Sequence, residues 1–268
     1  MRDTTAEAGR GAETAKPGLS RACPRAYTHC PMRLALFDID GTLMQAGGAG
    51  MRAFVRAIGE VFDVTVDRKA INPDGKTDPL IAREFLAHCG EEHRLNEVSG
   101  AALFSAYLIA LEDEMERARA AGSVRVLPGV VELLEALSSS PEFALGLVTG
   151  NLERGAVIKL SKAGLDGYFH FGGFGSDSAD RTGLIREGIG RGARHVAPRP
   201  VEAAFVFGDT PLDVSHGRAA GATVIAVASG RYSRAELDAC NPDLVLPDLT
   251  AVGPILSFLR EGLPGSLR

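Results

Sequence analysis

The segment from Leu34 to Leu43 constrains the fold of this chain more than any other, and it reads LALFDIDGTL. Its apolar first half is typical of a strand that is buried on both faces of a parallel sheet. Asp38 and Asp40 follow where that strand ends, and ligands of open α/β sheets bind at the carboxyl ends of strands. Two carboxylates this close repel each other unless a cation or a proton lies between them. Because Gly41 lets the backbone turn sharply toward a ligand, the segment predicts metal-assisted chemistry.

Segments with strand and helix patterns alternate after residue 127. The predicted strands cover residues 143–148, 168–171, 203–207 and 223–227. Strands that alternate with helices imply right-handed parallel connections, with helices on both faces of the sheet. We therefore expect an α/β fold with a doubly wound, Rossmann-like parallel sheet.

Residues 46–122 interrupt this alternation with apolar residues at helical spacing, beginning with Met51, Phe54 and Ile58. Thr77 or Asp78 can cap a second helix of this region, whose first turn then holds a proline. The pattern predicts an all-helical cap, residues 46–122, inserted into a catalytic core formed by residues 32–45 and 123–268.

The first 31 residues are rich in Ala, Gly, Thr, Arg and Pro, and they have no apolar periodicity. They also lack the apolar centre of a secretory signal. We expect a disordered tail without function, or an over-extended start, because Met32 directly precedes the first predicted strand.

Composition narrows the partners and the compartment. The net charge of −5 argues against nucleic acid, whose binding usually needs a basic patch. No apolar run approaches the roughly 18 residues of a membrane span, so no membrane partner is expected. Because the four cysteines lack metal-type spacing, they indicate a reduced, cytoplasmic setting. They are Cys23, Cys30, Cys89 and Cys240.

Two further predicted strands end in polar residues. One ends in Thr149-Gly150-Asn151, and the other ends in Asp209, with Asp213 four residues later. Mg²⁺ prefers oxygen ligands and binds one or two carboxylates together with water and substrate phosphate. Asp38 and Asp209 can supply those carboxylates, while Asp213, one helical turn further on, can orient a ligand or water.

Three motifs resemble those of the haloacid dehalogenase superfamily. They are Asp-Ile-Asp-Gly-Thr-Leu, the strand that ends in Thr149, and Gly-Asp-Thr-Pro-Leu-Asp, and together they cover nearly all of residues 33–250. The position of the insert is similar to that in helical-cap members such as phosphoglycolate phosphatases and β-phosphoglucomutases. The resemblance implies a Mg²⁺-dependent phosphatase that acts on a small phosphorylated metabolite, as a monomer or homodimer.

The resemblance also implies a role for each matching residue. Asp38 would be the nucleophile that forms an aspartyl-phosphate. Asp40 would protonate the leaving alcohol and then activate water, with its backbone carbonyl facing the metal. Thr149 and the backbone N–H groups of Gly150 and Asn151 would hold the phosphoryl oxygens. Metal binding would involve the side chains of Asp38 and Asp209, with Asp213 close by.

This chain departs from the superfamily at one further motif, which normally supplies a Lys that bridges nucleophile and phosphate. Residues 175–181 read Gly-Ser-Asp-Ser-Ala-Asp-Arg and contain no Lys. Arg181 keeps the positive charge and can bind phosphate through two donors, although its geometry differs from that of Lys. Lys159 and Lys162 are alternatives, but they fall within the preceding predicted helix, away from the sheet edge. We favour Arg181.

Several of these residues also have a simpler interpretation. Thr149 is suited to a turn, Asn151 to capping the following helix, and Asp213 to the first turn of a helix. Lys76, in Gly75-Lys76-Thr77-Asp78, can reach the leaving group of a substrate when the cap closes, or it can belong to a solvated turn.

The leading functional interpretation is a phosphatase, with phosphoglycolate as the closest named substrate. The alternatives are a phosphomutase of the β-phosphoglucomutase type, a phosphonate hydrolase, and a binding module without catalysis. A phosphonate hydrolase would need a cap lysine, Lys69 or Lys76, that forms a Schiff base. Asp40 argues against the binding module, because binding alone does not need a second acid.

Overall fold

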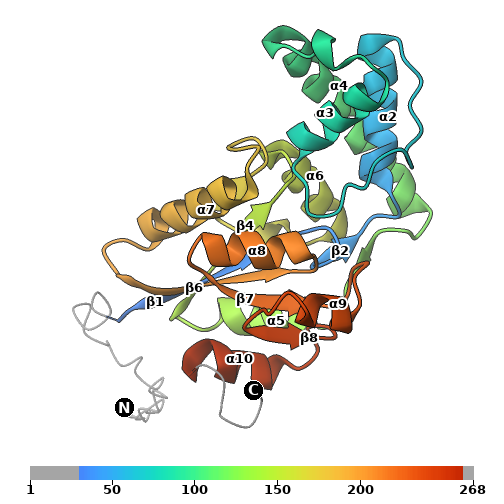
Figure 1. The fold of residues 1–268 in the computed structure, drawn as a ribbon. Coiled ribbons are helices and arrows are strands. Elements are labelled where there is room, and N and C mark those ends of the chain that lie inside the picture. The colour runs from blue at the N-terminus through green and yellow to red at the C-terminus, as the bar shows by residue number, and fades with distance from the viewer. Residues whose placement is uncertain (1–29, 262–268) are drawn as a thin grey trace, which may run out of the picture.

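A computed structural model describes residues 30–261 of the chain (Figure 1). The predicted tail therefore lies outside the described residues, apart from its last two positions. No helix in the described part of the chain is both long and apolar enough to cross a membrane.

The centre of the fold is a six-stranded sheet in which every neighbouring pair is parallel. Its order is β5-β4-β1-β6-β7-β8, so the first strand lies in the middle. This topology confirms the doubly wound α/β class. The strands are β1 (Met32–Phe37), β4 (Phe143–Thr149), β5 (Gly172–Phe174), β6 (Val201–Gly208), β7 (Thr223–Val227) and β8 (Leu244–Leu246).

Successive side chains of a strand point to opposite faces of the sheet, so the apolar strands expose apolar side chains on both faces. Helices cover both of these faces. Leu34 and Leu36 of β1 pack in the cluster under α7 (Arg181–Val196), whereas Phe37 belongs to the cluster under α5 (Val130–Ser138) and α10 (Val252–Glu261). The helices of the sheet region are α5 (Val130–Ser138), α6 (Glu153–Ala163), α7 (Arg181–Val196), α8 (Pro211–Ala219), α9 (Arg234–Asp238) and α10 (Val252–Glu261).

The register of the central strands brings the predicted motifs to one edge. Phe37 pairs with Leu147 of β4 on one side and with Phe207 of β6 on the other. The residues that follow these three positions therefore emerge together at the carboxyl edge of the sheet, as parallel strands require.

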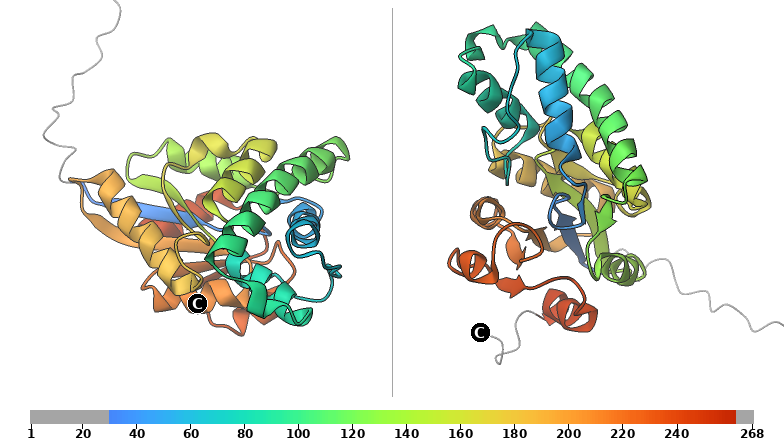
Figure 2. Two further views of the ribbon diagram at one scale, coloured as in Figure 1. Left: turned by 90° about the horizontal axis from the view of Figure 1, so that it is seen from above. Right: turned by 90° about the vertical axis from the view of Figure 1, so that its right-hand side faces the viewer.

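The segment between β2 (Met44–Gln45) and β3 (Arg125–Val126) contains helices and no strand in the described structure. These two short strands form an antiparallel ribbon, and the helices stand together beyond the carboxyl edge of the sheet (Figures 1 and 2). They are α2 (Ala49–Phe62), α3 (Asp78–His88), the 3₁₀ helix η1 (Glu92–Arg94) and α4 (Glu97–Ala120).

The helices of this segment are joined to the sheet region by a common apolar cluster. Phe54 of α2 stacks on Tyr107 of α4, with ring centroids 3.9 Å apart. Both rings belong to the cluster that also contains Phe37 of the sheet. We keep the name cap for residues 46–122, and their separation from the core as a domain stays a prediction.

The predicted strand at residues 168–171 is wrong. Residues Asp166–Tyr168 form a 3₁₀ helix (η2), and the strand lies further on, at Gly172–Phe174. Glycines form this strand because α7 crosses it closely, and a Cβ on Gly173 would lie 1.8 Å from the carbonyl oxygen of Leu184. Phe171 instead packs its ring against Gly146, at a position where that glycine leaves room.

Candidate active site

A cavity of about 170 Å³ lies between the carboxyl edge of the sheet and the cap. The sheet side contributes the polar residues singled out in the sequence, and the cap contributes mainly apolar residues and the loop around Lys76. The sheet-side residues are Asp38, Asp40, Thr149, Gly150, Asn151, Lys159, Arg181, Asp209 and Thr210.

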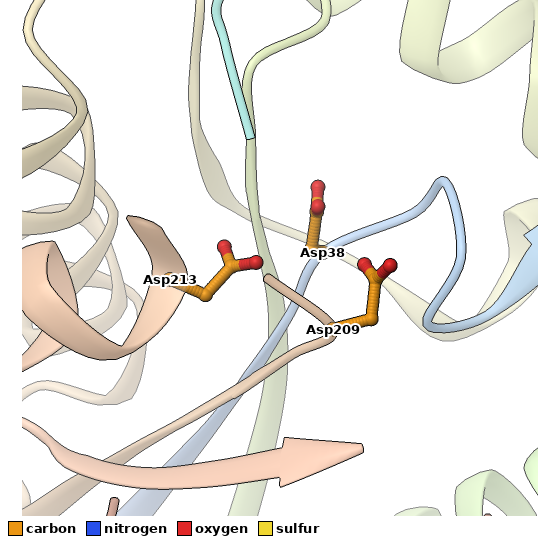
Figure 3. Close-up of side chains that lie close together, drawn as sticks. All are labelled: Asp38, Asp209 and Asp213. Atoms are coloured by element: carbon orange, nitrogen blue, oxygen red, sulfur yellow. The ribbon is translucent and has the colours of Figure 1, made fainter. Parts of the chain in front are cut away.

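Three buried carboxylates converge at the floor of this site (Figure 3). One oxygen of Asp38, one of Asp209 and one of Asp213 all lie within 4.8 Å of one another. The backbone N–H of Asp38 donates to the carbonyl oxygen of Phe207 at 2.9 Å, which fixes the end of β1 against β6. Gly230 leaves room for Asp209, because a Cβ there would lie 1.7 Å from its Oδ2.

The charge of this cluster favours a cation. The pKa of Asp38 is raised to about 6, chiefly by burial, with the charges of Asp213 and Asp40 acting in the same direction and that of Arg181 opposing them. Burial and the charges of Asp213 and Asp38 also raise the pKa of Asp209 well above its usual range. When all three carboxylates are ionised, the guanidinium of Arg181 balances one of their charges. A divalent cation would neutralise the two negative charges that remain.

The hydrogen bonds distinguish the three carboxylates. Asp213 Oδ1 accepts from Arg181, while its Oδ2 accepts from the backbone N–H of Thr210 at 3.0 Å and from its hydroxyl at 2.7 Å. Both oxygens of Asp213 are thus used to hold Arg181 and to cap α8. Asp38 and Asp209 are therefore the better candidates to hold Mg²⁺, in agreement with the carboxylate preference of that ion.

Arg181 lies against the candidate nucleophile. α7 begins at this residue, with Asp180 as the N-cap, and Nη2 of Arg181 lies 3.1 Å from Oδ2 of Asp38. The arginine is buried, and burial opposes its charge while Asp213 and Asp38 raise its pKa. Lys162 instead pairs with Glu116 at 3.0 Å, outside the cavity.

The residues after β4 form a tight polar turn. Nδ2 of Asn151 donates to the hydroxyl of Thr149 at 2.8 Å and to Oδ2 of Asp40 at 2.8 Å. The interpretation of Asn151 as a helix cap is wrong, because the N-cap of α6 is Leu152. Asn151 is held inward by the two polar groups that it contacts.

The expectation that Lys159 lies away from the sheet edge is also wrong. Its ammonium reaches Oδ2 of Asp40 at 2.5 Å, and its side chain is buried. Burial disfavours the charge of Asp40, but Lys159 and Asn151 together hold the pKa of that carboxyl below its usual value. One signal in the sequence was available, since Lys159 shares a helix face with the small residues Gly155 and Ala156.

The cap loop packs directly on the turn after β4. The backbone N–H of Asp78 donates to the carbonyl oxygen of Gly150 at 2.7 Å, and Arg181 donates to the carbonyl oxygen of Gly75 at 3.3 Å. Lys76 lines the cavity, but its ammonium pairs with Glu84 of α3 at 2.5 Å.

Asp78 caps no helix in this structure. Thr77 is the N-cap of α3, and its hydroxyl accepts from the backbone N–H of Leu80. Asp78 is buried instead, and its Oδ2 accepts from the backbone N–H of Leu152 at 2.8 Å. The sequence pattern indicated only a possible helix cap at Asp78, and the structure adds its position at the site.

The sequence of this chain is similar to those of known proteins. The family model of haloacid dehalogenase-like hydrolases matches residues 32–221. A phosphoglycolate phosphatase of Agrobacterium fabrum is 29% identical over 226 residues, which are 83% of this chain and 91% of that protein. One of Rhodospirillum rubrum is 25% identical over 245 residues, 86% of this chain and 93% of that protein.

A solved structure supports the fold assignment. The crystal structure described as a predicted phosphoglycolate phosphatase from Haemophilus somnus superposes with a TM-score of 0.59. The match covers 84% of this chain and 98% of that one, at 19% sequence identity.

Proposed function

We propose that this chain, which belongs to the haloacid dehalogenase-like hydrolase family and is a phosphatase, cleaves a small phosphomonoester through an aspartyl-phosphate on Asp38. The observation that carries the proposal is the position of Asp38. Its carboxylate lies 3.1 Å from Arg181 and in one cluster with Asp209, at the floor of a cavity. A carboxylate between a guanidinium and a candidate cation site is suited to attack an anionic ester.

The residues present fit a magnesium cofactor. Asp38 and Asp209 would hold Mg²⁺, which neutralises charge so that an anionic ester can approach an anionic nucleophile. Arg181 would bind the non-bridging phosphoryl oxygens, and the turn from Thr149 to Asn151 would add hydroxyl and N–H donors.

The reaction has two steps. Binding of the anionic ester places negative charge beside Asp40, which raises its pKa so that it takes up a proton. In the first step, an oxygen of Asp38 attacks phosphorus, and the bond between phosphorus and the leaving oxygen breaks while Asp40 gives that oxygen the proton. In the second, Asp40 accepts a proton from a water molecule that attacks phosphorus. The acyl-phosphate bond then breaks, inorganic phosphate leaves, and Asp38 is restored as a carboxylate.

The cavity favours a small leaving group. Its volume of about 170 Å³ lies below the range of roughly 300–1,000 Å³ that drug-sized ligands occupy. The relatives named phosphoglycolate phosphatase share 25% and 29% of their aligned residues with this chain, which supports phosphoglycolate as the leading candidate substrate.

The two other enzymatic interpretations have less support. A phosphonate hydrolase needs a neutral cap lysine, whereas Lys76 is ion-paired with Glu84 and Lys69 lies on the surface. A phosphomutase of the β-phosphoglucomutase type would need a sugar phosphate that fits the same small cavity, and it remains the alternative.

A panel of phosphate esters tests the proposal. Purified protein with Mg²⁺ should release phosphate fastest from two- and three-carbon esters, including phosphoglycolate, and more slowly from hexose phosphates. Interconversion of hexose phosphate isomers without phosphate release would support the mutase, and inactivity on every ester would contradict both.

A further inference from the structure

We propose that Lys159 is a positioning residue for Asp40 and that Asp78, from the cap, holds Lys159 in place. The acid–base group would then be set in its working orientation when the cap loop lies on the sheet. This inference rests on the proposed role of Asp40 and concerns two residues, Lys159 and Asp78, to which that role assigns nothing.

The placement of Lys159 is the first observation. It projects from α6, its side chain is 6% exposed, and a lysine this buried is almost always paired. Its Nζ lies 2.5 Å from Oδ2 of Asp40. The ammonium also lies against the backbone of α2, because a Cβ on Gly50 would be 3.6 Å from it. Lys159 therefore bridges the interior of the core and the first helix of the cap.

The second observation is the way in which Asp40 is held. Oδ2 accepts from Lys159 of α6 and from Asn151 of the turn after β4. No hydrogen bond to Oδ1 occurs among the described residues, and Asp40 lines the cavity with about half of its side chain exposed. A carboxyl group with one oxygen fixed and the other facing the cavity is oriented for proton transfer to a leaving group.

Asp78 supplies the third observation. It is buried at the start of α3, and the backbone N–H groups of Leu152 and of Asp78 itself tie it to the turn after β4. Its Oδ2 lies beside the face of α6 that carries Lys159, because a Cβ on Gly155, one turn before Lys159, would be 3.8 Å from that oxygen. Against the effect of burial, the charges of Asp40 and Asp78 both raise the pKa of Lys159. Tyr107 of α4 lines the same cavity as Asp78 and Lys159.

These contacts link the position of the cap to Asp40. The loop that carries Asp78 belongs to the cap, whereas Lys159 and Asp40 belong to the core. When the cap loop leaves Gly150, Lys159 loses the second acid that fixes its ammonium. Proton donation by Asp40 is thereby coupled to the presence of the cap on the substrate.

The test compares two substrates that differ in their need for a proton. An alkyl phosphate needs acid assistance to expel its alcohol, whereas p-nitrophenyl phosphate releases a stable anion. Lys159→Met should lower kcat/KM for the alkyl phosphate by about 100-fold or more, which is the scale of general acid catalysis, but by less than about tenfold for the aryl ester. Asp78→Asn should shift the ratio of the two values in the same direction by a smaller factor.

Lys162→Met is the matched control, because Lys162 lies one turn further along α6 and pairs with the cap residue Glu116 outside the cavity. It should leave the ratio unchanged. An equal loss on both substrates in Lys159→Met would show a merely structural role and overturn the proposal, and so would no loss at all.

If Lys159→Met unfolds, Lys159→Gln, which keeps a polar head group, replaces it, and thermal melting verifies folding. A double-mutant comparison is the second safeguard. In an Asp40→Asn background either substitution should no longer change the ratio, because the group that it positions is gone. Wild-type protein that hydrolyses neither ester would refute the proposed function, whereas an active wild type with an unshifted ratio in the variants would refute only this inference.

Discussion

Arg181 joins two carboxylates that belong to different strand ends, because its Nη2 atom contacts both Asp38, at 3.1 Å, and Asp213. All three side chains are less than 10% exposed. Removing one member of a buried ion pair leaves an uncompensated charge, which usually costs far more than the pair contributes. The arginine is therefore expected to matter for stability as well as for catalysis.

Arg181→Ala should lower kcat/KM by at least about 100-fold, and it should lower the free energy of unfolding by about 3–5 kcal/mol. Arg181→Lys should recover only part of both, since a lysine cannot reproduce the two-donor geometry. Phosphate release and urea unfolding measure the two effects. Arg186→Ala, on the exposed side of α7, is the control, and normal turnover in Arg181→Ala would contradict the assignment.

Asp38→Asn should abolish turnover, because an amide cannot form the aspartyl-phosphate. Acid quenching after incubation with a ³²P-labelled ester should trap label on the wild-type protein and none on the variant. Asp113→Asn, a substitution on the surface of α4, should leave labelling intact. Label that persists in Asp38→Asn would show that another residue is the nucleophile.

Chelation of divalent ions should stop phosphate release, and added Mg²⁺ should restore it. Asp209→Asn should raise the Mg²⁺ concentration needed for half-maximal activity by at least about tenfold, because one of two carboxylate ligands is lost. Mg²⁺ should also raise the melting temperature of the wild type, since it binds the folded state. A chelator-treated sample with full activity would contradict the cofactor assignment.

Gly150→Ala should weaken the contact between the cap loop and the turn after β4. A Cβ on Gly150 would lie 2.1 Å from the carbonyl oxygen of Lys76, so the loop has to move away. We expect at least a tenfold loss in kcat/KM, in line with the cost of a misplaced lid. Gly253→Ala, where the Cβ meets nothing within 4 Å in α10, is the control and should be neutral or slightly stabilising.

Asp78 should make stability depend on pH. Burial raises its pKa to about 6 in the folded state, even though Lys159 attracts its charge. The folded state therefore holds this proton more tightly than the unfolded state. The resulting contribution to the free energy of unfolding is complete below a pH of about 4 and is lost as pH rises through about 6. It amounts to about 3 kcal/mol in total. Urea unfolding between pH 4.5 and 7.5 should show a shallower decline in Asp78→Asn than in wild type. Equal slopes in the two proteins would count against the assignment.

The sequence pattern was sufficient to predict the buried strands and the polar residues that follow them. Continuous apolar runs marked β1, β4, β6 and β7 because these strands are buried on both faces. The polar residues that follow β1, β4 and β6 were placed at one edge because parallel strands share their direction. These features need no knowledge of which helix packs where.

Tertiary packing decided what the pattern missed. Phe169 and Phe171 have high strand propensity, yet the glycines at 172 and 173 form β5, because only they allow the close approach of α7. Lys159 was predicted to lie away from the sheet edge, because the face that α6 turns to the cavity depends on its contact with α4 and the cap. Only its spacing from Gly155 and Ala156 indicated that face. Asp78 was missed for the same reason, since its burial depends on a loop closing over Gly150.

The ribbon of β2 and β3 carries both chain crossings between the sheet region and residues 46–122, side by side. Every other contact between residues 46–122 and the sheet region is therefore non-covalent. These contacts include the hydrogen bond from Asp78 to Gly150 and the ion pair between Arg231 and Asp74. A substitution that weakens them changes how the cap covers Asp38 while the chain connection through the ribbon stays the same.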